Sequence, residues 1–275
     1  MLKTRVLTGC VLAAVLLLGL FLLPAFWSVL AFGLVFVIGA WEWAGFGMLR
    51  GPAARSGYTV GVALVLLLGW WWSGEGSHLI ILLAIACLWW VIAFWWLLLG
   101  PSRHRRVVTL VCGFAVLAPA FVALARLQTS TQGFARGPVI VLWLILMVCA
   151  ADIGAYFAGR AFGRRKLAPL VSPGKTVEGA LGGLAMVALV AGLGAAYFGL
   201  APLIVIAFGL AVGIFSIVGD LTESMFKRAA ALKDSGTLLP GHGGLLDRID
   251  SVTAAAPWYA LGLFGSGVLA GPVST

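Results

Sequence analysis

Nine long apolar runs, separated by short polar segments, restrict what this sequence can fold into. A helix that crosses the hydrocarbon core of a bilayer needs about 20 predominantly apolar residues, and most of the runs approach that length. The chain is 62% hydrophobic and 10% charged, whereas a soluble domain carries about 25% charged residues. We therefore predict an all-α polytopic membrane protein with about nine transmembrane helices. Their approximate ranges are 6–23, 27–48, 58–72, 79–99, 107–125, 138–159, 177–199, 201–219 and 251–271.

The basic residues predict the orientation of these helices. The formal net charge is +9, and every one of the 18 Lys and Arg residues except Arg126 and Arg136 falls in alternate polar segments, beginning with the amino terminus. Cytoplasmic loops of membrane proteins carry such an excess of Lys and Arg. We therefore expect a cytoplasmic amino terminus in a multi-pass protein of the cytoplasmic membrane, and the positive charge does not call for a nucleic-acid partner.

The acidic residues are concentrated in the second half of the chain. Of the nine, all except Glu42 and Glu75 lie between positions 152 and 250. A carboxylate at membrane depth is costly and indicates a functional site. We therefore predict a single integral unit with two parts: a transmembrane scaffold of about five helices in residues 1–137, and a catalytic region of about four helices in residues 138–275. The active site is expected in a polar cavity of this second part, facing the cytoplasm.

The longest polar segment, residues 219–251, joins the last two predicted helices. If the eighth helix continues into this segment, five polar residues share one of its faces because of their spacing: Asp220, Glu223, Ser224, Lys227 and Arg228. A solvated helix end that carries an ordinary ion pair would show the same pattern.

A glycine-rich turn follows, and two aspartates come after it. The turn holds His242, Gly243 and Gly244; its backbone N–H groups can converge on an anion, although an ordinary turn is the alternative. Asp247 and Asp250 then lie near the start of the ninth helix, where one of them could cap it. Together with Asp220 they form an oxygen cluster that suits a hard cation such as Mg²⁺.

A second polar block covers residues 151–179. Its PGKT letters resemble part of a phosphate-binding P-loop, but Pro169 stands where that motif needs glycine, and no strand is predicted before it. Ser172, Lys175 and Thr176 are instead expected at the start of the seventh helix, where hydrogen-bond donors and a positive helix end favour an anion.

Residues 224–250 match the pattern S-x-x-K-R-x-x-x-x-K-D-x-G-x-x-x-P-x-H-G-G-x-x-D-R-x-D at every specified position. This segment resembles the signature of the integral-membrane phosphatidate cytidylyltransferases of bacterial type, also called CDP-diacylglycerol synthases. The earlier block is similar to a second region of that family, D-x-x-A-Y-x-x-G followed by S-P-x-K-T-x-E-G, from Asp152 to Gly179.

The resemblance implies transfer of a cytidylyl group from CTP to phosphatidic acid, which gives CDP-diacylglycerol and pyrophosphate. The catalytic residues are then Asp220, Lys227, Arg228, Asp247 and Arg248. The substrate-binding residues are Ser172, Lys175, Thr176, Ser224, Lys233, Asp234, His242, Gly243 and Gly244. The Mg²⁺ ligands are Asp220 and Asp247, with Glu223 and Asp250 as alternative or supporting ligands. Residues that orient this set are Asp152, Tyr156 and Glu178.

The resemblance also implies a monovalent cation such as K⁺, whose ligands the sequence does not identify. The expected partners are CTP, phosphatidic acid and the lipid bilayer, and homodimer formation is left open. A membrane transporter is the alternative function, since transporters also combine intramembrane acids with glycine-broken helices.

Overall fold

The computed structural model describes residues 2–99, 106–131, 136–241 and 243–269. Within these residues the chain forms nine α-helices and one two-stranded sheet. The helices are α1 (Leu2–Phe21), α2 (Ala25–Phe46), α3 (Pro52–Trp72), α4 (Gly76–Leu99), α5 (Arg106–Gln128), α6 (Gly137–Phe162), α7 (Val177–Phe198), α8 (Pro202–Ala229) and α9 (Leu246–Gly265). The strands are β1 (Lys166–Ala168) and β2 (Ser172–Thr176).

Each of the nine apolar runs corresponds to one helix, so the helical architecture is confirmed. In the described part of the chain, seven helices, α2 to α8, are long and apolar enough to cross a membrane. Two of the nine predicted spans fall outside this group. In α1 the apolar helix covers only Leu7–Phe21. Helix α9 is enclosed by α4, α5 and α8 and is built partly of small residues such as Ala254 and Ala255. By length and composition these two helices are therefore not among the candidate membrane spans.

Helix α8 runs on to Ala229, past the predicted end at residue 219. The added turns contain good helix formers such as Leu221, Met225 and Lys227. The expectation that the five polar residues from Asp220 to Arg228 lie on one continuous helix is therefore confirmed.

The strands form a hairpin that was not predicted. Strand β1 pairs antiparallel with β2, and the PGKT letters lie in β2. The expectation that no strand precedes Lys175 was wrong, because strands this short, with Pro and Gly inside one of them, carry the composition of a turn. Of the three residues expected at the start of the seventh helix, only Thr176 lies there: its Oγ1 accepts a hydrogen bond from Gly179 N at 3.1 Å and so caps α7. The expectation was wrong for Ser172 and Lys175, which lie in β2.

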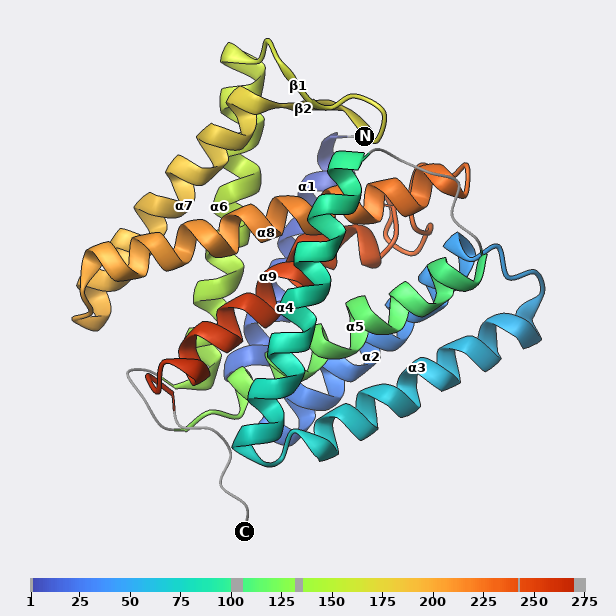
Figure 1. Ribbon diagram of the computed structural model, residues 1–275, viewed down its shortest axis with the longest axis horizontal. Helices are drawn as coiled ribbons and strands as arrows, with labels where there is room; N and C mark the ends of the chain where they lie inside the picture. The colour runs from blue at the N-terminus through green and yellow to red at the C-terminus, as the bar shows by residue number, and fades with distance from the viewer. Residues whose placement is uncertain (1, 100–105, 132–135, 242, 270–275) are drawn as a thin grey trace.

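Helices α6 and α7 lie against each other along most of their length, with the hairpin at one end of the pair (Figure 1). Small residues allow this approach: a Cβ at Gly154 would lie 2.5 Å from Gly182 O, and one at Gly183 would lie 2.6 Å from Ala151 O. Close backbone contact at small residues is a common way to pack helices in membranes. The hairpin is therefore carried by a tightly joined helix pair.

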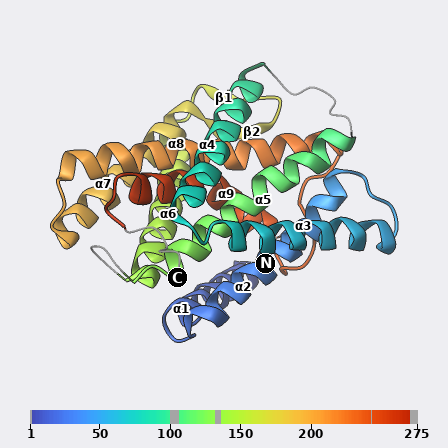
Figure 2. The same cartoon turned by 60° about the horizontal axis from the view of Figure 1, so that its bottom comes forward.

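Helices α4, α5 and α8 pack around α9, which lies in the interior between α8 and α5. Helices α1 and α2 lie together at one edge (Figure 2). The start of α1, the α2–α3 connection, the hairpin and the α8–α9 loop lie toward one side of the molecule (Figure 1). The α3–α4 and α7–α8 turns lie toward the opposite side. This is the alternation that the predicted topology requires; which side faces the cytoplasm stays a prediction.

Candidate active site

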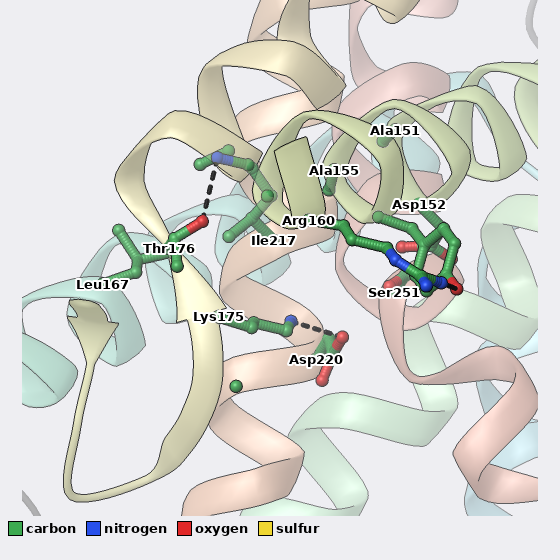
Figure 3. A pocket seen from close by; sticks show the side chains of 15 residues that line it. Ala151, Asp152, Ala155, Arg160, Leu167, Lys175, Thr176, Ile217, Asp220 and Ser251 are labelled. Carbon is green, nitrogen blue, oxygen red and sulfur yellow. Dashed lines mark hydrogen bonds and ion pairs between the residues drawn. The ribbon is translucent and has the colours of Figure 1, made fainter. Parts of the chain in front are cut away.

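A cavity of about 480 Å³ opens between α6, β2, α7 and α8, close to the start of α9. Figure 3 shows Lys175 on β2 and Asp220 on α8 pointing toward each other across it, with Asp152 and Arg160 of α6 on another wall. The polar lining residues are Asp152, Tyr156, Arg160, Lys175, Thr176, Asp220 and Ser251. The cavity thus brings together the two polar blocks of the sequence.

Lys175 and Asp220 form an ion pair through Nζ and Oδ2. Their side chains keep 30% and 24% of their surface exposed. Ser224, one turn after Asp220, donates a hydrogen bond from Oγ to Asp220 Oδ1 at 3.4 Å. This pair is therefore open to a ligand that enters the cavity.

Arg160 and Ser251 line this cavity but were not among the predicted site residues. Arg160 donates from Nη1 to the Tyr156 hydroxyl at 3.0 Å, although the sequence assigned it to membrane topology. Its position four residues after Tyr156, on the face that also carries Asp152, was the signal that could have identified it.

A second ion-pair cluster joins α8 to α9. Lys227 Nζ lies 2.5 Å from Asp247 Oδ1 and 3.1 Å from Glu223 Oε1. The exposed fractions are small, 10% for the Lys227 side chain and 7% for that of Asp247. Glu223 Oε2 is buried and has no hydrogen-bond partner among the residues that the structure describes. One ammonium therefore serves two carboxylates away from bulk water.

The second oxygen of Asp247 is held by the loop before α9. Oδ2 accepts hydrogen bonds from Ser235 N and Gly244 N, each at 2.9 Å. Burial acts to raise the pKa of Asp247, but the Lys227 ammonium and these two amides outweigh it and hold the pKa below its ordinary value. Asp247 is therefore a fixed negative charge, and these amides bind the protein's own carboxylate.

A second cavity, of about 700 Å³, is bounded by the α8–α9 loop and the first turn of α9. Lys233, Asp234, Gly243 and Arg248 line it. The predicted residues of the loop are thus gathered around one hollow, except that Gly244 lies behind it against Asp247 and His242 lies outside the described residues.

The comparisons with known proteins assign this arrangement to a family. Residues 3–264 match the model of the "Cytidylyltransferase family". The chain belongs to this family. Two relatives bear the name phosphatidate cytidylyltransferase. The protein from Haemophilus influenzae is 41% identical, over 94% of this chain and 98% of the relative. The protein from Pseudomonas aeruginosa is 43% identical, over 97% of this chain and 98% of the relative.

Nine predicted residues in the described part of this cytidylyltransferase lie outside the lining of both cavities: Ser172, Glu178, Glu223, Ser224, Lys227, Arg228, Gly244, Asp247 and Asp250. Three of them belong neither to the two ion-pair clusters nor to α9 and its loop. Ser172 lies in β2. Arg228 donates from Nε to Val171 O at 3.4 Å and from Nη1 to Leu232 O at 3.2 Å, and so links the hairpin turn to the α8–α9 loop. Glu178 accepts the backbone N–H of Arg164 at 2.9 Å. Arg228 and Glu178 therefore hold backbone segments that carry the site.

The sequence suggested that Asp247 or Asp250 could cap the start of α9, but neither residue does so. Its cap residue, Leu245, provides no side-chain hydrogen bond. Asp250 Oδ1 accepts from the adjacent Ser251 N at 2.7 Å. The first amides of α9 instead donate to Glu42 of α2, a residue that the sequence gave no role in the site.

The site of the cytidylyltransferase offers carboxylate oxygens, and oxygen atoms are the ligands that a hard divalent cation such as Mg²⁺ prefers. The buried Oε2 of Glu223 is one such oxygen with no partner in the described chain. The carboxylates of Asp220 and Asp247 form ion pairs with Lys175 and Lys227. Accordingly, no three His, Cys, Asp or Glu side chains converge as a ligand set anywhere in the described ranges.

Proposed function

We propose that this cytidylyltransferase transfers a cytidylyl group from CTP to phosphatidic acid and releases pyrophosphate. The observation that carries the proposal is the similarity, at 41% and 43% identity over nearly the whole chain, to two proteins named phosphatidate cytidylyltransferase. Ser251 lines the first cavity and Arg248, one turn earlier on α9, lines the second, and the two cavities give room for a lipid phosphate and a nucleotide.

This reaction needs positive groups that offset the negative charge of the two substrates, and it does not need a strong base. A phosphate monoester has a second pKa of about 6, so the phosphate of the lipid is already largely ionised near pH 7. One of its oxygens forms a bond to the α-phosphorus of CTP, while the bond from that phosphorus to the bridging oxygen of the β-phosphate breaks. The electron pair leaves with pyrophosphate, and the remaining task is to hold two polyanions in line.

The cations of the two cavities are placed to perform this task. Lys175 faces the first cavity, and Lys233 and Arg248 face the second. Each of these side chains can donate to phosphate oxygens, and Lys175 can do so by turning away from the half-buried Asp220. Lys227 offsets part of the negative charge of Glu223 and Asp247. Together these cations offset the charge of both substrates.

We propose further that Asp220 and Asp247 hold Mg²⁺, with Glu223 and Asp250 as alternative ligands. When bound, Mg²⁺ supplies positive charge to the phosphate oxygens at the reacting phosphorus. The proposal requires that the Asp220 carboxylate leaves Lys175 and binds the metal instead. In the same way, Asp247 must leave Lys227. The polyphosphate of CTP is the anion that can then take up these ammonium groups.

The activity is tested by incubating purified protein with radiolabelled CTP, with and without phosphatidic acid and Mg²⁺. We expect labelled CDP-diacylglycerol and pyrophosphate only when all three are present. Label that stays in CTP while the protein, reconstituted in vesicles, moves a solute across the bilayer would favour the transporter alternative.

We place the site on the cytoplasmic side of a bacterial inner membrane, because the alternate loops that carry most of the Lys and Arg residues lie on its side of the molecule. Single cysteines at Gly51 and Lys233, in a chain without the four native cysteines, should react with an impermeant reagent only in inverted vesicles. A cysteine at Gly76 should react in intact cells. The reverse pattern would overturn the orientation.

A further inference from the structure

Glu42 is the one acidic residue of the five N-terminal helices that reaches the signature segment, residues 224–250. It lies on α2, is only 6% exposed, and accepts three hydrogen bonds. Ser235 Oγ donates to Oε2 at 2.8 Å, Leu245 N to Oε1 at 3.0 Å and Leu246 N to Oε2 at 2.8 Å. A charged acceptor is thus placed at the positive amino-terminal end of α9, where it is favoured.

Ser235 connects Glu42 to Asp247. Its hydroxyl donates to Glu42 and accepts from Asp247 N at 3.3 Å, while its backbone N–H donates to Asp247 Oδ2 at 2.9 Å. The Asp247 carboxylate is therefore oriented by a residue that Glu42 holds in place. Its other oxygen points to Lys227 as a consequence.

Two glycines of the signature segment make room for this contact. A Cβ at Gly236 would lie 2.6 Å from Glu42 Oε1, and a Cβ at Gly244 would lie 2.5 Å from Oε2. Real Cβ atoms do not approach other atoms so closely, so any side chain at either position would displace the carboxylate. The family pattern specifies glycine at both positions, and the contact with α2 gives a physical reason for it.

We propose that Glu42 is a positioning residue of the active site: through Ser235 and the first amides of α9 it fixes the Asp247 carboxylate and the loop that carries Lys233. The catalytic part of this inference, that Glu42 supports turnover, rests on the proposed function. The geometric part, that Glu42 orders the loop around Asp247, stands without it and can be tested without substrates.

The first experiment follows amide hydrogen exchange of the detergent-solubilised full chain, in the wild type and in Glu42→Gln. The amide groups of Leu245 and Leu246 touch Glu42 directly, whereas those of Ser235 and Gly244 touch only Asp247. We expect all four to exchange at least about tenfold faster in the variant. Faster exchange confined to residues 245 and 246 would overturn the proposal, because Glu42 would then only cap α9.

The matched control is Glu75→Gln, which changes the other acidic residue of the N-terminal helices. Glu75 lies at the α3–α4 turn, where it accepts from Ser77 Oγ at 3.0 Å and lies 3.5 Å from His78 Nδ1. The Glu75→Gln variant should show the same amide exchange and the same turnover as the wild type.

The second experiment measures turnover per folded protein against CTP, phosphatidic acid and Mg²⁺. For Glu42→Gln we expect kcat to fall about tenfold or more and the Mg²⁺ concentration for half-maximal rate to rise several-fold. Ser235→Ala should do the same, and the double variant should be no worse than the poorer single one, because both changes cut the same connection. Additive losses, or kcat and Mg²⁺ values equal to those of Glu75→Gln, would contradict the proposal.

Ser235→Ala alone decides the question if Glu42→Gln does not fold, since it leaves Glu42 bound to α9 and removes only the connection to Asp247. Unchanged exchange at Gly244 in that variant would overturn the inference. A wild type that shows the expected exchange pattern but no transfer from CTP would instead contradict the proposed function.

Discussion

The two lysine–aspartate pairs at the site have the same chemistry and opposite surroundings. Lys175 and Asp220 face a cavity, and each keeps about a quarter or more of its side chain exposed, at 30% and 24%. Lys227 and Asp247 keep 10% and 7%, and Asp247 has two further backbone donors. The open pair can exchange partners as soon as a ligand arrives, whereas the buried pair also holds two helices and a loop in register until it exchanges Lys227 for the proposed metal.

Energetics support this division. An exposed ion pair contributes about 0–1 kcal/mol to stability, because water solvates both charges nearly as well apart as together. Removal of one partner from a buried pair costs roughly 3–5 kcal/mol, because the other charge is left without compensation. The two pairs should therefore respond alike in activity and differently in stability.

The largest effect is expected from Asp220→Asn and Asp247→Asn. Each change nearly preserves volume and removes a negative charge that we assign to the metal site, so turnover should fall by roughly 10³-fold, near the upper end for loss of one electrostatic contact. Because Asp247 belongs to the buried pair, Asp247→Asn should also lower the free energy of unfolding, by about 1–3 kcal/mol, since the buried groups that donate to Asp247 lose a charged acceptor.

These variants are compared by pyrophosphate release at saturating Mg²⁺ and by unfolding in mixed micelles. Asp220→Asn should unfold like the wild type within about 1 kcal/mol. Near-normal turnover of Asp220→Asn would exclude it as a metal ligand, and equal stability losses in both variants would remove the distinction between the pairs.

The next effect concerns the lysines. Lys227→Met leaves Glu223 and Asp247 buried together without a cation, and we expect it to lower the free energy of unfolding by about 3–4 kcal/mol. Lys175→Met should change it by less than about 1 kcal/mol and instead raise KM for at least one substrate. Denaturant titration in micelles measures the first quantity, and a matrix of substrate concentrations measures the second.

The smallest effect separates two arginines outside both pairs. Arg248 lines the second cavity, where a guanidinium can bind phosphate oxygens bidentately and an ammonium cannot. Arg248→Lys should therefore lose about tenfold in turnover, the equivalent of about 1.4 kcal/mol. Arg165→Lys keeps the charge of an exposed residue between α6 and β1 and should stay within about twofold. Equal, small changes at both positions would show that Arg248 is only another interfacial cation.

Much of the fold and the family could be predicted from the sequence, because both depend on local patterns. Apolar runs near 20 residues predicted each of the nine helices, and the spaced polar residues between Ser224 and Asp250 indicated the family that the comparisons confirm.

The missed features all depend on contacts between distant segments. Glu42 lies 193 residues before Ser235, and nothing in a single sequence indicates that two such positions meet. Asp247 carries the features of a helix cap, yet the amide groups that it was expected to cap are taken by Glu42. The three-residue strand β1 is stable only because it pairs with β2, and residues 166–168 alone give no sign of that pairing.

The packing of α6 on α7 has a consequence for how mutational scans of this protein are read. Lys175 owes its place opposite Asp220 to a hairpin mounted on these two helices, and the helices owe their spacing to Gly154, Gly182 and Gly183. A single methyl group at one of these glycines would push the pair apart and move the hairpin with it. Such variants should lose activity although the glycines contact no substrate, and a scan that scores activity alone would count them among the catalytic residues.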